Sequence, residues 1–439
     1  MGEAPHQRAP VTSPFLWGVA TSSYQIEGAA ENDWTAWEAA GRLKAPGKRC
    51  GVATGHRERW RSDFSLLPTI GVNAYRFSVE WSRIEPRPGQ FDWDALALEV
   101  ERVELLRRLG IEPVVTLNHY THPSWFWEDG GWEDRRSVDR FARFASVVAE
   151  ALEGRVRRWV TLNEPIVLLL GGFLAGMIPP GRNSFAAAAA ALENLLRAHV
   201  AAAAALKERD SSARIGIAHN MLEFAADRPA NSLDRKLAAL GDRLYNLALL
   251  EAIATGDMSW WFPGEGKTDF RIPELPSSND FVGLNYYSRV HLRFAGLPGA
   301  IGQFFYRDPE RRGLTDTGWE VYPEGFDRAL RRAAAAGRPV LVTENGIATG
   351  DDGLRRTFLH EHVLVLAHRR AAGTDIEGYF HWSLIDNFEW LEGFGPRFGL
   401  FEVDYATFAR RRRLSADLFA SLGRSFASDE VRERVRIGG

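Results

Sequence analysis

Eight short apolar runs, which alternate with segments of helical periodicity, constrain the fold of this chain more than any other feature. Strands that are hydrophobic throughout are typical of a parallel sheet that is covered on both faces. Eight β/α units in one chain predict an α/β fold, namely a closed (β/α)8 TIM barrel in a single domain with elaborated βα loops. The runs cover residues 15–21, 74–81, 112–119, 158–165, 214–220, 281–288, 340–346 and 375–384.

The segments between the runs supply the helices that such a barrel requires. The first helix is expected to end or bend at Pro68, because proline disrupts the helical hydrogen bonds. Residues 257–280 and 295–320 contain several Pro or Gly residues and are expected to be irregular. The other expected helices cover residues 94–109, 134–153, 185–208, 232–255, 324–336, 353–372 and 414–426.

The two ends of the chain differ from the barrel in character. We expect residues 1–13 to be a disordered leader, residues 14–427 to form the barrel and residues 428–439 to be a tail. The four arginines at 410–413 are expected to form a solvated surface. Because the leader lacks the apolar segment of a signal peptide, we expect a cytoplasmic protein.

Composition excludes several classes of partner. A net charge of −3 over 439 residues gives no reason to expect binding to nucleic acid or to an anionic membrane. No stretch has 18 consecutive apolar residues, so we expect no membrane-spanning helix. Cys50 is the single cysteine, which excludes an intrachain disulfide and fits a reducing compartment. The sequence leaves the oligomeric state open, and a homo-oligomer is possible.

Two of the apolar runs end in a carboxylate. VLVTENG, residues 340–346, carries Glu344 near its end, and RWVTLNEP, residues 158–165, carries Glu164. A charge at the tip of a buried strand costs free energy unless a function requires it. Because the C-terminal strand tips of a barrel carry its catalytic groups, we expect Glu164 and Glu344 to face each other across one pocket.

Further polar and aromatic side chains recur at the same end of the other runs. Such recurrence is what a site at the barrel mouth requires, whereas scattered polar residues would mean little. Amide, imidazole and carboxylate groups can bind sugar hydroxyls, and an indole face can cover the apolar face of a sugar ring. These residues are Gln25, Arg76, Asn118, His119, Asn163, Asn285, Tyr287 and Trp382.

Two carboxylates within such a ring suit the hydrolysis of glycosides. The leaving oxygen needs a proton, and the developing oxocarbenium centre needs a negative partner. The sequence does not give the separation of the carboxylates, so the residues alone leave retaining and inverting chemistry open. His119 and His122 have the HxxH spacing of some metal sites, but no third ligand motif lies nearby. We therefore expect neither a metal nor a cofactor.

The sequence resembles the glycoside hydrolase family 1 β-glycosidases over about residues 15–425. The resemblance implies a retaining, β-glucosidase-like enzyme that cleaves β-O-glycosidic bonds at the nonreducing end through a covalent glycosyl-enzyme. It further implies side activity on β-galactosides and β-fucosides, with a small β-glycoside or a short oligosaccharide as substrate. The matching blocks, in the order of the family, are FLWGVATSSYQIEG, YRFSVEWSRI, LNHY, TLNEP, DFVGLNYYS, VTENGIA and HWSLIDNFEW.

The resemblance also implies a role for each residue of the site. Glu344 would be the nucleophile, and Glu164 would be the general acid and then the general base. Arg76 and Tyr287 would support Glu344, the first by its charge and the second by a hydrogen bond. Asn163 would hold the 2-hydroxyl of the sugar. The other substrate-binding residues would be Gln25, His119, Asn285, Glu389 and Trp390, with Trp382 as the stacking floor.

The chain departs from the family pattern at a few positions. Ile166 stands where the family often has Trp, so the aglycone side is expected to be more aliphatic or more open. Glu389 stands where members that bind phosphorylated sugars tend to have Ser, which disfavours a 6-phosphate substrate. Gly55 stands where the family commonly has Asp, which concerns local packing. Position 164 carries Glu rather than Gln, which argues against a thioglucosidase that dispenses with the general acid.

Three alternatives remain from the sequence. A transglycosidase would use the same site, and product analysis with added alcohols would distinguish it. A catalytically silent sugar-binding protein would bind glucose without turning over aryl glycosides. An unrelated barrel enzyme that depends on a metal would lose activity on chelation.

Overall fold

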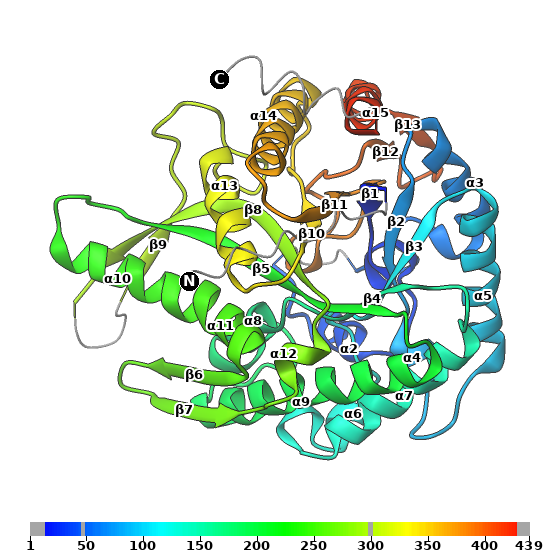
Figure 1. Ribbon diagram of the computed structural model, residues 1–439, viewed down its shortest axis with the longest axis horizontal. Helices are drawn as coiled ribbons and strands as arrows, with labels where there is room; N and C mark the ends of the chain where they lie inside the picture. Colours follow the sequence, from blue (N-terminus) through cyan, green and yellow to red (C-terminus); the bar gives the residue numbers. More distant parts are fainter. Residues whose placement is uncertain (1–13, 45–48, 297–301, 428–439) are drawn as a thin grey trace, which may run out of the picture.

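The computed structural model describes residues 14–44, 49–296 and 302–427, and eight parallel strands close into a barrel at its centre (Figure 1). The strands follow one another around the barrel in chain order, and pairing between β8 and β10 closes the ring. The predicted TIM barrel is therefore confirmed, whereas the expected leader and tail lie outside the described residues. The barrel strands are β1 Leu16–Ala20, β2 Ala74–Ser78, β3 Glu112–Asn118, β4 Arg158–Asn163, β5 Arg214–Ala226, β8 Phe281–Phe294, β10 Val340–Asn345 and β11 Ile376–Trp382.

Helices follow each barrel strand and surround the barrel (Figure 1). The first of them ends at Thr69, one residue after Pro68, as expected. Among the described residues, none of the helices combines the length and the apolar character needed to span a bilayer. The outer helices are α3 His56–Thr69, α5 Trp93–Arg108, α7 Ser137–Ala151, α9 Phe185–Arg209, α10 Ser232–Asp242, α11 Ala248–Thr255, α13 Pro323–Ala335, α14 Asp352–Ala371 and α15 Leu414–Ala427.

The side chains of the strands alternate between the interior of the barrel and the layer beneath the helices. On β1, Trp17 and Val19 pack in the large outer cluster, whereas Leu16 and Ala20 pack in a small inner cluster. Ala74 of β2 also belongs to the inner cluster. Because the period of a strand is two residues, Arg76 points to the same side as Ala74, into the barrel. The inner cluster fills the interior of the barrel and reaches the mouth at Trp382 and Phe398, where polar side chains join it.

Residues 257–280 contain an antiparallel hairpin, and the expectation of irregular structure was wrong there. It pairs β6, Asp257–Phe262, with β7, Gly266–Arg271. Of the Pro and Gly residues that suggested irregularity, Pro263 and Gly264 lie in the turn, Gly266 begins β7, and Pro273 and Pro276 follow the hairpin. Met258 and Trp260 are buried on one face of β6, while their neighbours are more exposed. This period of two is the signal of a half-buried strand.

The expected loop at 295–320 also contains a strand, β9 Gly302–Phe305, which pairs antiparallel with the end of β8. Strand β8 is 14 residues long and β5 is 13, so both continue past the barrel mouth and remain paired there. Figure 1 shows β5, β8 and β9 extending together away from the barrel. This extension forms one wall beside the barrel mouth.

The arginine run at 410–413 is only partly solvated, so the predicted solvated surface is wrong for half of it. Arg410 forms an ion pair with Asp63, and Arg413 forms one with Asp386, both at 2.8 Å. Both aspartates are buried, and a buried carboxylate requires a partner of opposite charge. The other two arginines of the run remain in contact with solvent.

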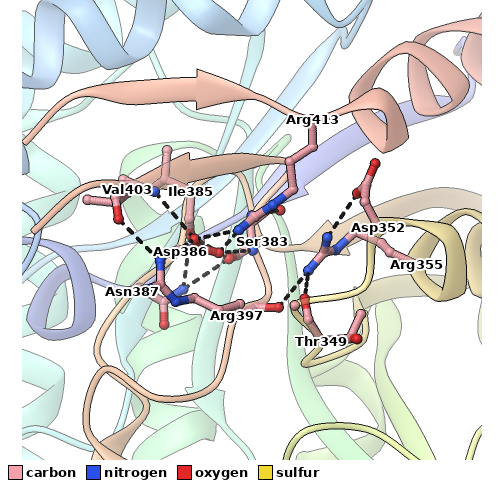
Figure 2. A network of polar contacts seen from close by, with 12 residues as sticks. Thr349, Asp352, Arg355, Ser383, Ile385, Asp386, Asn387, Arg397, Val403 and Arg413 are labelled. Carbon is pink, nitrogen blue, oxygen red and sulfur yellow. Dashed lines mark hydrogen bonds and ion pairs between the residues drawn. The ribbon is translucent and has the colours of Figure 1, made fainter. Parts of the chain in front are cut away.

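Asp386 is the centre of a polar network that anchors the loop after β11 (Figure 2). Its carboxylate accepts hydrogen bonds from Arg397 Nη1 at 3.2 Å and from the backbone amide of Gly399 at 2.9 Å. Beside it, Arg355 of α14 donates to the backbone carbonyls of Thr349 and Arg397. The network therefore ties the loop after β10 to the loop after β11, where both enter the barrel mouth.

Candidate active site

Glu344 lies at the C-terminal end of β10, in the mouth of the barrel. The residue is 3% exposed and lines a cavity of about 490 Å³. A β-carbon on Gly346 would lie 1.9 Å from the carbonyl oxygen of Trp382, so only glycine allows the chain after β10 to pass this close to β11. The TENG motif therefore combines a carboxylate with the glycine that its position requires.

Two side chains from other strands contact the Glu344 carboxylate. Arg76, from β2, donates from Nη1 to Oε1 at 2.6 Å, and Tyr287, from β8, donates its hydroxyl to Oε2 at 2.5 Å. The Arg76 guanidinium also donates to Asn163 Oδ1 at 2.6 Å and to Thr116 Oγ1 at 3.1 Å. Because the partners of Arg76 come from three strands, β3, β4 and β10, the buried cation is fixed beside Glu344.

The surroundings of Glu344 act on its pKa in opposite directions. The pKa of this carboxyl is raised to about 7, chiefly by burial and also by the negative charge of Glu164. The charge of Arg76 and the hydrogen bonds from Arg76 and Tyr287 lower the pKa. Glu344 therefore exchanges its proton near neutral pH, and the cation beside it stabilises the ionised form.

Glu164 follows β4 and receives hydrogen bonds only from uncharged donors among the described residues. Its Oε1 accepts from Asn285 Nδ2 at 2.6 Å and from Asn220 Nδ2 at 3.0 Å, and its Oε2 accepts from the hydroxyl of Tyr120. The backbone of Glu164 is left-handed, with φ of 50°, which is rare outside glycine. Glu164 and Glu344 line the same cavity, but only Glu344 is paired with a cation.

Gln25 and Glu389 lie together at another side of the cavity. Gln25 Nε2 donates to Glu389 Oε2 at 3.1 Å and to the carbonyl of Phe388 at 2.9 Å, while its Oε1 accepts from Ser22. Burial raises the pKa of Glu389 to about 8, and the charge of Glu344 also raises it. Glu389 is therefore mostly uncharged at neutral pH and can donate as well as accept a hydrogen bond.

His119 lies between two indole rings at the cavity wall. Its ring centroid lies 5.8 Å from that of Trp382 and 6.2 Å from that of Trp390, with interplanar angles of 13° and 10°. Burial and the charge of Arg76 hold the pKa of His119 well below its usual range, so the imidazole is neutral. Its Nδ1 has no hydrogen-bond partner among the described residues. That nitrogen is buried, and the other ring nitrogen, Nε2, lies 3.4 Å from Nδ2 of Asn163 in the cavity lining.

His122, the second histidine of the HxxH spacing, lies in the protein interior. Its Nδ1 bonds to Asp33 Oδ2 at 2.8 Å, and its Nε2 accepts from Trp132 Nε1 at 2.8 Å. Both ring nitrogens are therefore engaged by structural partners. Within the described ranges, no group of three or more His, Cys, Asp or Glu residues could hold a metal ion.

The structure places two predicted residues differently from the expectation. Ile166 is 1% exposed and packs in the core, because the short helix α8, Pro165–Leu168, turns its side chain away from the cavity. Val167 lines the cavity instead. Asn285 is fully buried behind the cavity wall, where its Oδ1 accepts from Thr343 Oγ1 at 2.6 Å. Its amide contacts Glu164, so its expected direct contact with substrate is not seen in the cavity lining.

Comparison with known proteins agrees with this geometry. The model of the family described as glycosyl hydrolase family 1 matches residues 7–426. The chain belongs to glycosyl hydrolase family 1. Beta-glucosidase A of Thermotoga maritima is 36% identical over 90% of this chain and 93% of its own length. A β-galactosidase of Pyrococcus woesei is 31% identical over 93% of this chain and 96% of its own length.

Solved structures agree with the sequence matches. A β-glycosidase from Pyrococcus horikoshii has a TM-score of 0.86 and 40% sequence identity, and the match covers 96% of each chain. The family consists of retaining β-glycosidases, so this chain is a glycoside hydrolase of the β-glucosidase type, as the sequence blocks predicted.

Sequence reasoning missed three residues that surround Glu164 in this family 1 hydrolase. Asn220 ends the fifth apolar run, and the rule that selected the other strand-end residues would have found it. Tyr120 directly follows the strand-end pair Asn118-His119, so its position also carried a signal. Tyr245 comes from the turn of π-helix between α10 and α11, where no strand-end signal exists.

Proposed function

We propose that this glycosidase hydrolyses β-glucosides from the nonreducing end by double displacement, with Glu344 as nucleophile and Glu164 as general acid and then general base. The observation that supports this proposal is the unequal pairing of two carboxyls in one cavity. A cation and a phenol contact Glu344, whereas Glu164 has only neutral donors. One carboxyl thus has a cation beside it that stabilises its ionised form, and the other has no cation beside it.

The reaction then proceeds in two halves. Glu344 attacks the anomeric carbon while the Glu164 proton passes to the glycosidic oxygen, and the aglycone leaves as an alcohol. The bond to the sugar neutralises Glu344, so Glu164 is now the only anion of the pair. Glu164 takes a proton from water, the resulting hydroxide equivalent attacks the anomeric carbon, and the ester bond to Glu344 breaks.

Binding of the sugar ring falls to the other side chains of the cavity. Asn163, whose Oδ1 is held by Arg76, would bind the 2-hydroxyl, where a contact strengthens in the transition state. Trp382 would lie beneath the ring. The outer hydroxyls would contact Gln25, His119, Glu389 and Trp390, all of which line the cavity.

The choice among sugars depends on the pair Gln25 and Glu389. Because Glu389 is mostly uncharged at neutral pH, it can serve either an axial or an equatorial hydroxyl as donor or acceptor. We therefore propose glucose as the main sugar, with side activity on galactosides and fucosides. A 6-phosphate would bring further negative charge into the cavity that holds the carboxylate of Glu344, so we propose an unphosphorylated substrate.

The outer part of the cavity is apolar and rich in aromatic side chains. Leu222, Phe304, Tyr306 and Trp319 line it together with Val167. Phe304 lies on β9 and is 68% exposed, so an aglycone can cover it. We propose aryl or alkyl aglycones, or the apolar face of a second sugar, as the groups that bind there.

A panel of aryl β-glycosides tests the proposed roles. Glu344→Ala should be inactive and regain partial activity with azide or formate, which replace the missing carboxylate. Glu164→Ala should lose far more activity on phenyl glycosides than on 2,4-dinitrophenyl glycosides, because a good leaving group needs no proton. Glu153→Ala, which removes an exposed carboxylate at the other end of β4, is the control. Normal hydrolysis by Glu344→Ala would contradict the assignment.

A further inference from the structure

We propose that Tyr120 is a positioning residue for the acid–base step, whose hydroxyl stabilises the ionised form of Glu164 after its proton has left. The inference rests on the proposed role of Glu164. The hydroxyl of Tyr120 donates to Glu164 Oε2, and both residues line the cavity. Tyr120 is 7% exposed, so the contact is largely shielded from water.

The other carboxyl oxygen of Glu164 is committed to accepting hydrogen bonds. Asn285 and Asn220 both donate amide N–H groups to Oε1, at 2.6 Å and 3.0 Å. Tyr245 donates its hydroxyl to Asn220 Oδ1 at 2.7 Å, which turns the Nδ2 group of this amide toward Glu164. With two donors on Oε1, the acid proton is carried by Oε2, the oxygen that Tyr120 contacts.

A phenol suits this position because it can accept or donate a hydrogen bond. While Oε2 carries the proton, the Tyr120 oxygen can accept. When the O–H bond of Glu164 breaks, the proton forms a bond to the glycosidic oxygen and the electron pair remains on Oε2. Tyr120 then donates to this anion, and hydrogen bonds to charged acceptors are stronger than those to neutral ones. The bond therefore favours loss of the proton.

The backbone and ring contacts of Tyr120 fix this geometry. Tyr120 has φ of 71° and Glu164 has φ of 50°, so both partners adopt the left-handed region that non-glycine residues rarely occupy. Such strained residues gather at functional sites. The Tyr120 ring meets His119 and Trp390 edge to face, with centroids 5.6 Å and 5.3 Å away.

Burial and the negative charge of Glu164 raise the pKa of Tyr120 well above its usual range, so Tyr120 keeps its proton and remains a donor. A pH effect at Glu164 also has to be separated from its other neighbours. The titratable or charged groups that face the pair are Glu344, Glu389, Arg76, His119, Tyr245 and Tyr287.

The variant Tyr120→Phe tests the proposal through the pH profile of kcat/KM. Without the donor, ionised Glu164 is less stable, so the alkaline limb should move up by about one pH unit. Phenyl β-glucoside should react about tenfold more slowly at neutral pH, while 2,4-dinitrophenyl β-glucoside should change little. Tyr286→Phe is the matched control, because it loses a buried phenol bond to the carbonyl of Tyr322 outside the cavity.

A second variant keeps the test decisive if Tyr120→Phe does not fold. Tyr245→Phe frees the amide of Asn220 to rotate and should move the alkaline limb in the same direction by a smaller amount. An unmoved limb in the folded variants, or an equal loss for all leaving groups, would overturn the role of Tyr120. Hydrolysis of phenyl β-glucoside by Glu164→Gln at the wild-type rate would instead overturn the proposed function.

Discussion

Replacing Arg76 with Met should move the acidic limb of the pH–rate profile to higher pH. The guanidinium lies 2.6 Å from Glu344 Oε1, and both side chains are buried. The pKa of Glu344 is already raised to about 7 by burial, against the lowering effect of Arg76. A carboxyl loses its charge below its pKa, so any further rise extends the inactive, protonated range upward.

The size of the shift follows from the geometry. Two unit charges about 4 Å apart interact by about 4 kcal/mol at an effective dielectric constant of about 20. Since one pKa unit corresponds to about 1.4 kcal/mol, losing the Arg76 charge should raise the pKa of Glu344 by about three units. At pH 7 the ionised fraction, and with it kcat/KM, should fall several hundredfold, on the order of 10²–10³.

The assay uses 2,4-dinitrophenyl β-glucoside, because its leaving group needs no proton and the alkaline limb set by Glu164 is then unimportant. Arg76→Lys keeps a cation but loses the fixed fork of donors, so we expect a shift of about one unit. Arg158→Met is the matched control: it removes a buried arginine of β4 that pairs with Glu112 outside the cavity. An acidic limb in Arg76→Met that stays at its wild-type position would refute this reasoning.

Three further predictions concern stability and the aglycone. Arg410→Ala should lower the free energy of unfolding by about 3–5 kcal/mol, because it removes a charged partner from buried Asp63. Arg411→Ala is the control: the Arg411 side chain is 68% exposed, so the free energy of unfolding in urea should change by no more than about 0.5 kcal/mol. Glu389 holds its proton to about pH 8 when folded but only to its ordinary range when unfolded, so wild type loses stability as pH rises from about 4.5 to 8. The stability advantage of Glu389→Gln should therefore grow over this window and then level off; a constant difference would contradict it. Phe304→Ala should raise KM for aryl glycosides about fivefold with little change in kcat, and an unchanged KM would exclude Phe304 from the aglycone site.

The barrel was predictable because each strand carries its own local signal. The eight apolar runs and their helices follow from periodicity, and the strand tips carry Glu164 and Glu344. The hairpin β6–β7 was missed because Pro and Gly residues of its turn lie between strands of only six residues. The structure of this region depends on pairing between β6 and β7, and a local sequence pattern does not show that pairing.

The same limit applies to the site. Whether a residue faces the cavity or the core depends on the backbone path after each strand, and α8 turns Ile166 inward and Val167 outward. Arg410 and Arg413 are drawn from solvent by ion pairs with Asp63 and Asp386. The local sequence around the arginines contains neither aspartate. A run of equal charges therefore predicts solvation only when no buried opposite charge lies within reach.

Strand β8 contributes to both the catalytic centre and the aglycone wall along one continuous segment. Its first half carries Asn285 and Tyr287 among the barrel strands, and its second half pairs with β9, which brings Phe304 to the cavity. Insertions or exchanges in the hairpin beyond residue 290 can therefore alter the aglycone wall while the first half of the strand remains clamped between β5 and β10. Such a layout lets leaving-group preference diversify between related enzymes, or in directed evolution, while the bond-breaking chemistry is inherited unchanged.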